Sequence, residues 1–302
     1  MSAKLRIERA GPLCTIQDGG RQGLLAQGIS ASGPMDRGAH GFAGRLAGAD
    51  DGAGIEMTRA GLDLQVVLGR LTLGWAGGAF RVQVNGEDLS WPGSADLAEG
   101  DRLSITPGPA GNYGYLRFDG SLDLPKVLGS RSTNMRAKLG GLEGRALVAG
   151  DVLAFSGPAG RAGAAQLAPH EPGAGPIRFV WGIHAENFTP DVRLRFDHSV
   201  FRVTPMMDRM GVRLDDEAGV FSGASILSLV SDPILAGDIQ ILGDGTPIVL
   251  MRDHQPTGGY PRIGTIISAD LDRFAQIRPG EAVAFTPVSI EHAQRLLRSD
   301  QS

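Results

Sequence analysis

The 302-residue sequence predicts a mainly β protein built from two β domains, with few short helices. Three observations predict this class. Apolar runs are short and separated by turn residues, as strands of barrels and sandwiches are. Glycine is abundant, with 45 residues. One phrase, a glycine turn followed by an acidic residue and alternating apolar positions, recurs at residues 99–105, 149–155 and 279–285. Its recurrence near the end of each half suggests two related β units.

The first half contains a series of strand-like runs. They cover residues 5–9, 54–58, 63–68, 70–75, 79–84, 103–106, 113–118 and 152–155. Asn85-Gly86 between two of these runs predicts a hairpin, because a type I′ turn needs positive φ at both central residues. Glu56 lies in an apolar strand, where a carboxylate needs a partner, and we expect a salt bridge to an arginine.

The second half continues in the same way. Strands are expected at residues 177–181, 199–204, 226–230, 248–251, 263–268 and 282–285. Helices are expected at residues 35–47, 270–277 and from Ser289 to about 298. For the first helix, Pro34 suits the opening position, with Ser32 or Gly33 as the cap. A Gly-, Ala- and Pro-rich stretch at residues 156–175 is the expected linker, which divides the chain into domains 1–165 and 166–302.

Composition excludes several function classes. A formal net charge of −4 gives no electrostatic case for nucleic acid or an anionic membrane. Cys14 is the only cysteine, so no internal disulfide or cysteine-based zinc site is expected, and the six histidines form no metal pattern. Walker, Rossmann and serine-hydrolase motifs are absent from the sequence. No secretory signal or membrane-spanning run is found, so we expect a cytoplasmic protein. From the cysteine and histidine pattern we expect no bound metal.

The polar loop at residues 251–261 lies between two apolar runs and has paired glycines, Gly258 and Gly259. Paired glycines let the backbone approach a ligand closely. Asp253, Thr257 and Tyr260 are its candidate ligand-binding groups. A solvated hairpin is the alternative interpretation.

A second glycine-dense segment near the N-terminus supports a ligand site. Residues 11–23 bring Gln17, Asp18 and Arg21 close together after a strand. The next loop, with Ser32, Gly33 and Asp36, ends at an expected helix N-terminus. Free amides there favour an anion such as a carboxylate or phosphate. Plain helix capping by Ser32 and Asp36 is the alternative.

Two further arginines are candidate anion contacts. Arg209 lies in a loop that also holds Asp208 and Arg213, and its planar guanidinium can clamp a carboxylate or a developing oxyanion. Arg131, followed by Ser132, is the other, with an ion pair as the alternative role.

These segments resemble one known family. Gly11-Pro-x-x-Thr-x-Gln-Asp-x-Gly-Arg-x-Gly23, Ser32-Gly-x-Met-Asp36, Ile55-Glu56 and Arg131-Ser132 resemble the first half of the biotin-dependent carboxyltransferase A/B family. Gly140–Leu147, Asp208–Gly211, Gly237-x-Ile-Gln240, 247–251 and Thr257–Pro261 resemble its later motifs. The resemblance covers nearly the whole chain in the same order, and the family includes components of 5-oxoprolinase and the carboxyltransferase part of urea amidolyase.

The resemblance implies two packed β-barrel domains, the second cyclophilin-like, with a site between them. It also implies a cyclophilin-like partner chain, the B subunit, joined in 5-oxoprolinase by the A subunit, and ATP-dependent opening of 5-oxoproline to glutamate. Opening a lactam needs donors for charge on its oxygen and a carboxylate as base or water-orienting group. Catalytic roles are therefore expected for Asp18, Arg21, Arg209, Asp253 and Tyr260. Substrate-binding roles are expected for Gln17, Ser32, Gly33, Asp36, Arg131, Ser132, Gln240, Thr257, Gly258 and Gly259.

Departures from the family pattern occur at two loops. Trp181-Gly182-Ile183 stands where a Pro-Gly-Pro turn is expected, and Asp253-His-Gln-Pro256 differs from the usual form. The substrate alternatives are therefore 5-oxoproline, with ATP used at the level of the complex, and urea or a related amide, with carboxybiotin. In the second case, biotin-carrier and biotin carboxylase parts would lie on other chains. A non-catalytic regulatory partner of a cyclophilin-like kinase inhibitor is a third possibility.

Overall fold

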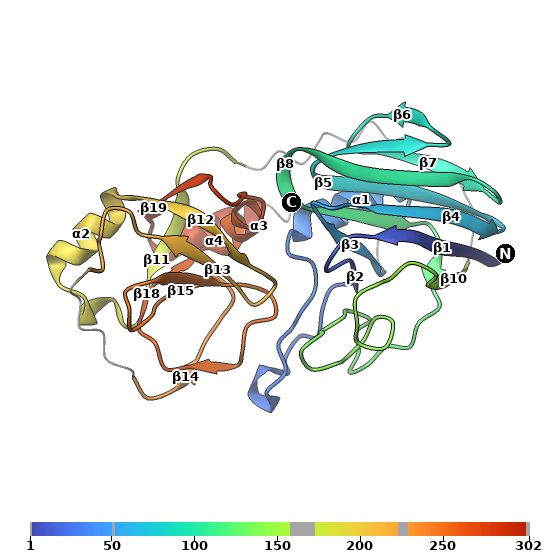
Figure 1. Ribbon diagram of the computed structural model, residues 1–302. Helices are drawn as coiled ribbons and strands as arrows, with labels where there is room; N and C mark the ends of the chain where they lie inside the picture. Colours follow the sequence, from blue (N-terminus) through green and yellow to red (C-terminus); the bar gives the residue numbers. More distant parts are fainter. Residues whose placement is uncertain (1, 50–51, 158–172, 223–228, 300–302) are drawn as a thin grey trace. The chain divides into compact units, whose positions relative to one another are not determined.

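The computed structural model describes residues 2–49, 52–157, 173–222 and 229–299 (Figure 1). The chain divides into two compact units. The first comprises Met1–Gln22 and Ser32–Glu171, and the second comprises Gly23–Ala31 and Pro172–Ser302. Most of the expected linker, 158–172, and three residues of the expected strand at 226–230 lie outside the described residues. The membership of Gly23–Ala31 in the second unit has no signal in the sequence.

The first unit contains a ten-stranded sheet in its described residues. Its strands are β1 (Ser2–Ala10), β2 (Thr15–Gln17), β3 (Gly54–Thr58), β4 (Leu62–Leu68), β5 (Arg70–Val84), β6 (Glu87–Leu89), β7 (Gly93–Ala98), β8 (Arg102–Phe118), β9 (Ser121–Leu122) and β10 (Val152–Ser156). The main path runs β2-β3-β8-β4-β1-β10-β9, and β5 pairs with β6, β7 and β8. Nearly every strand expected in this half is present.

Two long strands replace four of the expected short ones. Residues 70–75 and 79–84 both belong to β5, while 103–106 and 113–118 both belong to β8. Register shifts between Gly77 and Phe80 interrupt the β5–β8 pairing without ending it. Gly77 has φ +110°, so the glycine-rich centre of β5 forms a bulge where the sequence suggested a turn. The expected Asn85-Gly86 turn is confirmed, with φ values of +52° and +89°.

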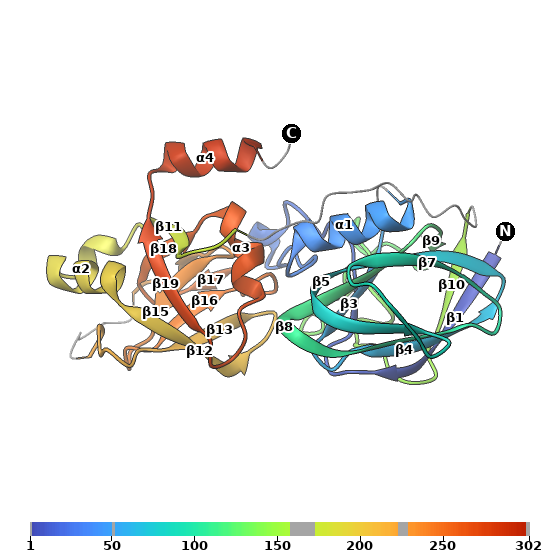
Figure 2. The ribbon, with the colours of Figure 1, turned by 90° about the horizontal axis from the view of Figure 1, so that it is seen from above.

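Helix α1 (Arg37–Ala47) lies against β5 and β8 (Figure 2). It begins two residues later than expected, because Asp36 is the N-cap and its carboxylate accepts a hydrogen bond from the Ala39 amide at 2.8 Å. Ser32 is not the cap; it has φ +55° and lies four residues earlier. Gly74 allows the close approach, since a Cβ there would be 2.3 Å from the Ala43 carbonyl oxygen.

The second unit is a closed barrel. Its strands are β11 (Ile177–Trp181), β12 (Val200–Met207), β13 (Gly211–Asp215), β15 (Asp238–Ile241), β16 (Pro247–Leu250), β18 (Arg262–Ile266) and β19 (Ala282–Pro287), in the order β11-β18-β15-β16-β13-β12-β19. A two-stranded sheet pairs β14 (Asp232–Pro233) with β17 (Thr257–Gly258). Phe196 lies among core rings, with Phe179, Phe201, Phe221 and Phe285 centroids within 5.9 Å.

The described part of this unit has three α-helices: α2 (Pro190–His198), α3 (Ser268–Ala275) and α4 (Ile290–Ser299). Helix α3 begins two residues earlier than expected, and α4 is capped as expected, by Ser289, whose hydroxyl accepts from the His292 amide at 3.2 Å. Helix α2 was not expected from the sequence, because only Phe196 of this helix is buried and its apolar periodicity is weak. Thr189 caps α2 and Pro190 opens it, which are local signals that were available.

The recurring turn phrase has the same geometry in each copy. The glycines at 100, 150 and 280 have φ +95°, +94° and +87°. In each turn the acidic residue's amide donates to the carbonyl three residues earlier, and its carboxylate accepts from the amide of that same earlier residue. The pairs are Asp101 with Ala98, Asp151 with Val148 and Glu281 with Arg278. The phrase is therefore a carboxylate-capped turn that starts a strand.

Within the described parts of the chain, no helix is long and apolar enough to cross a membrane. The same residues contain no group of three or more His, Cys, Asp or Glu side chains that could hold a metal ion.

Candidate functional site

The Asp18 carboxylate is the centre of a buried loop cluster in the first unit. It accepts hydrogen bonds from the hydroxyls of Ser130 and Ser132 and from the amides of Gly20 and Arg131. The Ser132 hydroxyl lies 2.7 Å from it and the Arg131 amide 2.6 Å from it. Burial tends to raise the pKa of Asp18, but these four donors outweigh burial and the pKa is lowered. The group is thus held as a carboxylate within the protein.

Arg21 joins the same two loops. Its guanidinium donates to the backbone carbonyls of Val127 and Ser132, and the side chain is 2% exposed. Arg131 directs its Nε to the Leu124 carbonyl at 2.7 Å and is half-buried. The Arg21 contacts join segments more than 100 residues apart in the sequence.

Gln17, Ser32 and Gly33 complete the cluster. The Gln17 Oε1 accepts from the Gly33 amide at 3.1 Å, and its Nε2 donates to the Thr133 carbonyl at 3.1 Å. Asn134 donates to the Ser32 hydroxyl at 3.2 Å. Gln17 and Ser32 are fully buried, so the structure brings together most of the expected first-half residues as an internal framework.

Glu56, in β3, is a second buried carboxylate of the first unit. Its carboxylate accepts from the Tyr115 hydroxyl at 2.9 Å and from the Met35 amide at 2.7 Å. A phenol and a backbone amide thus occupy the place where the sequence suggested an arginine. Through these bonds Glu56 ties the segment before α1 to the sheet.

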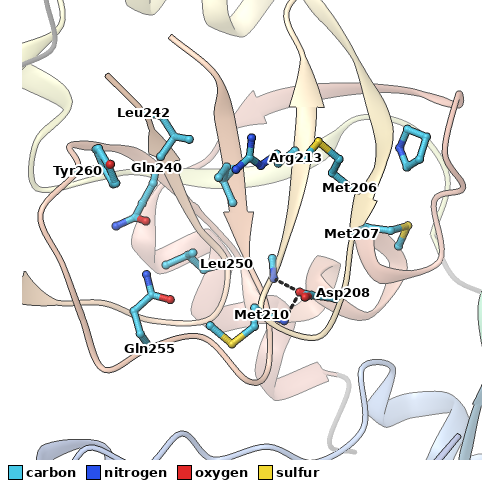
Figure 3. Close-up of a pocket in the computed structure, with 13 residues that line it drawn as sticks. Met206, Met207, Asp208, Met210, Arg213, Gln240, Leu242, Leu250, Gln255 and Tyr260 are labelled. Carbon is cyan, nitrogen blue, oxygen red and sulfur yellow. Dashed lines mark hydrogen bonds between the residues drawn. The ribbon is translucent and has the colours of Figure 1, made fainter. Parts of the chain in front are cut away.

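The second unit carries an open pocket of about 620 Å³ on the barrel wall (Figure 3). Its lining combines polar side chains with methionine, leucine and isoleucine. The lining residues are Pro205, Met206, Met207, Asp208, Met210, Gly211, Arg213, Gln240, Leu242, Ile248, Leu250, Gln255 and Tyr260. Concave sites with apolar walls and a few polar groups are the usual form of small-molecule sites.

Strand alternation explains which residues form the floor. Val212, Leu214 and Val249 point into the barrel core, so their neighbours point outward. Gln240 is opposite Ile248 in the β15–β16 pairing, and Ile248 is opposite Arg213 in the β16–β13 pairing. Gln240, Ile248 and Arg213 therefore form one row across three neighbouring strands.

The loop at residues 251–261 borders the pocket and is anchored by an ion pair. Arg209 Nε lies 2.8 Å from Asp253 Oδ2 and Nη2 lies 3.2 Å from Oδ1, in a bidentate arrangement. The Asp253 amide also donates to the Arg209 carbonyl at 2.7 Å. Both side chains are less than 10% exposed. The pair fixes the loop that supplies Gln255 and Tyr260.

The side-chain amide of Gln240 is a buried polar group of the pocket that is not fully satisfied. Gln240 is 2% exposed, and its Nε2 has no hydrogen-bond partner among the described residues. Gly258 gives this amide its space, since a Cβ there would lie 2.6 Å from Nε2. Figure 3 shows the amide ends of Gln240 and Gln255 directed toward the same part of the pocket. A buried unpaired donor costs free energy, which a ligand acceptor would recover.

The structure places the expected residues of this loop differently with respect to the pocket. Thr257 is exposed and lies in β17, and Gly259 accepts from the Leu229 amide at 2.7 Å; neither lines the pocket. Tyr260 is 41% exposed and does line it. His254 directs Nδ1 to the Gln255 carbonyl at 2.6 Å, and burial lowers its pKa.

Arg213 and Gln255 line the pocket but were not selected from the sequence. The sequence pointed to Arg209, four residues earlier, as the anion contact of this segment. The alternation of Val212 and Leu214 was the available signal, because it places Arg213 on the outward face of a strand.

The fold and these motifs define a class. The family model described as "Carboxyltransferase domain, subdomain A and B" matches residues 27–287, and the chain belongs to that family. Among its relatives, the C subunit of 5-oxoprolinase from Escherichia coli (strain K12) is 35% identical, over 98% of this chain and 95% of that protein. The Haemophilus influenzae protein of the same name is 32% identical, over 95% and 92%. The crystal structure of the K. lactis urea amidolyase matches with a TM-score of 0.86 and 26% identity, over 99% of this chain and 19% of that one.

Proposed function

We propose that this chain is one component of a 5-oxoprolinase complex that opens 5-oxo-L-proline to L-glutamate with ATP. The near-complete coverage of two proteins named as the C subunit of 5-oxoprolinase supports the proposal. The observation that carries it is the pocket around Gln240, where a buried amide lacks a partner among the described residues. A lactam offers both a carbonyl acceptor and an N–H donor, which primary amides match.

The residues of the pocket suit the lactam better than ATP. A triphosphate with its metal needs several cationic or amide donors and carboxylate ligands. The pocket has one arginine, Arg213, and the described residues contain no metal-holding cluster. We therefore assign the lactam to this pocket and ATP to the complex, whose further chains we propose to be the cyclophilin-like B subunit, together with the A subunit. Because turnover needs ATP, we place the reaction in the cytoplasm.

The proposed roles follow the geometry. Gln240, Gln255 and Tyr260 contact the substrate, and Gly258 makes room for Gln240. Arg209 and Asp253 act as positioning residues, because each satisfies the other and together they hold the loop. Gln17, Asp18, Arg21, Ser32, Gly33, Asp36, Arg131 and Ser132 are proposed to shape the loop framework of the first unit. In this proposal the γ-phosphoryl group of ATP passes to the lactam oxygen and ADP leaves, which makes the lactam carbon electrophilic. Water adds to that carbon, and the C–N bond breaks as the nitrogen takes a proton, leaving an acyl phosphate. A second water hydrolyses the acyl phosphate to glutamate and phosphate.

The test is 5-oxoproline-dependent ATP hydrolysis and glutamate release by the co-purified complex. We expect turnover with the wild-type chain and none when this chain is omitted. Gln240→Leu, which removes the amide, should raise KM for 5-oxoproline about 5- to 10-fold, as loss of one neutral hydrogen bond does. Gln294→Leu, at an exposed position of α4, is the matched control. A complete complex without turnover would refute the proposal.

A second candidate function has one supporting observation. The similarity to the K. lactis urea amidolyase extends over 99% of this chain. On that basis the chain would transfer a carboxyl group from carboxybiotin to urea or a related amide. The chain contributes residues for the amide, and biotin would reach it on another chain. Discharge of carboxybiotin that depends on urea, measured with this chain present and absent, distinguishes the two reactions.

A further inference from the structure

Arg213 is the one cationic side chain in the pocket lining. Among the described residues it forms no ion pair within 4 Å and no side-chain hydrogen bond. Nearby arginines of the same unit have carboxylate partners: Arg209 pairs with Asp253 and Arg252 with Asp272. The guanidinium of Arg213 is thus half-buried at the pocket surface, where a ligand can contact it.

Asp208, which lines the pocket, and Asp244 form no ion pair with Arg213. The Asp208 Oδ1 accepts from the Met210 and Gly211 amides at 2.7 and 3.2 Å. In Figure 3 the Arg213 side chain points away from the Asp208 carboxylate. The pKa of Asp244 is lowered, first by hydrogen bonds from Thr246 and last by the positive charge of Arg213. An anion at Arg213 would therefore meet an unpaired cation.

The register sets the distance between Arg213 and Gln240. Ile248 lies between them in the row across β15, β16 and β13. Two strand spacings separate their backbones by about 10 Å, and both side chains extend from the same face. A small ligand can therefore contact the Gln240 amide at one end and the Arg213 guanidinium at the other, with its carbon atoms on Ile248 and Leu250.

We infer that Arg213 is the specificity-determining residue of this pocket, and that it selects a small amide that carries a carboxylate over a neutral one. The inference rests on the proposed function and deepens it. A guanidinium binds a carboxylate through two parallel N–H···O bonds, whereas urea would leave the cation without a counter-charge. The carboxylate lies at Arg213, the amide at Gln240 and Gln255, and the apolar ring over the isoleucine and leucine floor.

The experiment compares two substrates in the complete complex: 5-oxoproline and 5-oxoprolinamide, its neutral carboxamide. Arg213→Gln should raise KM for 5-oxoproline about 10- to 100-fold, the range of a lost charge-assisted hydrogen bond. It should change KM for 5-oxoprolinamide by less than about threefold. Arg213→Lys, which keeps the charge without the planar fork, should lie between the two. Arg202→Gln, at an exposed arginine of β12 paired with Glu217, is the matched control.

Two results would overturn the inference: an equal rise in KM for both substrates, or no change for either. If the wild-type complex does not turn over 5-oxoproline, the proposed function fails, and binding then decides about Arg213. Ligand-observed NMR of the full chain with 5-oxoproline and 5-oxoprolinamide measures it. A preference for the carboxylate that Arg213→Gln abolishes supports the inference, and equal binding of both probes refutes it.

Discussion

Asp18 and Gln240 are both buried polar side chains, and their partners differ in kind. The Asp18 carboxylate accepts four hydrogen bonds from its own unit, whereas Gln240 Nε2 has no partner among the described residues. A satisfied group stabilises a loop, and an unsatisfied one at a pocket indicates a ligand. Two buried polar side chains therefore acquire different roles from their surroundings.

Asp18→Asn should destabilise the first unit by about 2–4 kcal/mol at pH 7, because a charged acceptor of four donors becomes a neutral one. The pKa of Asp18 is lowered in the folded state, so its contribution is present above the unfolded value of about 4. It is lost as pH falls through the folded pKa, and the difference between wild type and variant should shrink there. Hydrogen exchange at residues 127–134 measures this. Asp123→Asn, at an exposed aspartate, is the control. A pH-independent difference would contradict the prediction.

Gly258→Ala tests the space reserved for Gln240. A Cβ 2.6 Å from Gln240 Nε2 forces that amide to move, so KM for 5-oxoproline should rise about 10-fold and stability should fall by about 1–3 kcal/mol. Gly243→Ala is the control, since no atom lies within 4 Å of a Cβ there. Steady-state kinetics of the complex and the Tm of the chain are the measurements. If Gly258→Ala behaves like the control, the pocket does not depend on the position of Gln240.

Among the elements, strands were predictable and their continuity was not. Residues 5–9, 63–68 and 152–155 were recognised because their apolar alternation is local. The fusion of two runs into β5, and of two into β8, depends on pairing between them, which no local window contains. The start of α1 was misplaced for a related reason: Asp36 becomes the cap because the preceding segment is held by Glu56 and Gln17.

The loop at residues 251–261 is an element whose position depends on one buried ion pair. Asp253→Ala leaves the Arg209 guanidinium buried without its bidentate partner and should destabilise the second unit by about 3–5 kcal/mol. The double variant Arg209→Met/Asp253→Leu should recover much of this loss, because the pair's desolvation cost is removed with it. Hydrogen exchange of β16 at increasing urea concentration measures both. If the loss in the double variant equals the sum of the losses in Arg209→Met and Asp253→Leu, the pair is not coupled. Since these two residues position the loop at residues 251–261, kcat/KM should fall in Asp253→Ala, in which the loop loses its anchor.

At the scale of the whole chain, the two units have separate cores. Ile105 belongs to the buried cluster of the first sheet, and Phe196 lies among the rings of the barrel. Ile105→Ala should lower the stability of β8 by about 2–5 kcal/mol, and Phe196→Ala that of β16 by about 3–5 kcal/mol. Each loss should be confined to its own unit, as separate cooperative units require. Hydrogen exchange of β8 and β16 in both variants tests this, and an equal loss in both strands would contradict it.

The sequence by itself determined the mainly β class, the Asn85-Gly86 turn, the three recurring glycine turns and the family, because each is encoded in neighbouring residues. It also identified the segments that carry polar groups. Only the tertiary structure decided what those groups contact. Asp18 meets its serine donors, and Gln240 joins Arg213 in one row, through contacts between segments distant in the chain. Register and burial arise from such pairing, so the distinction between a satisfied aspartate and a pocket-lining glutamine without a partner among the described residues required the folded chain.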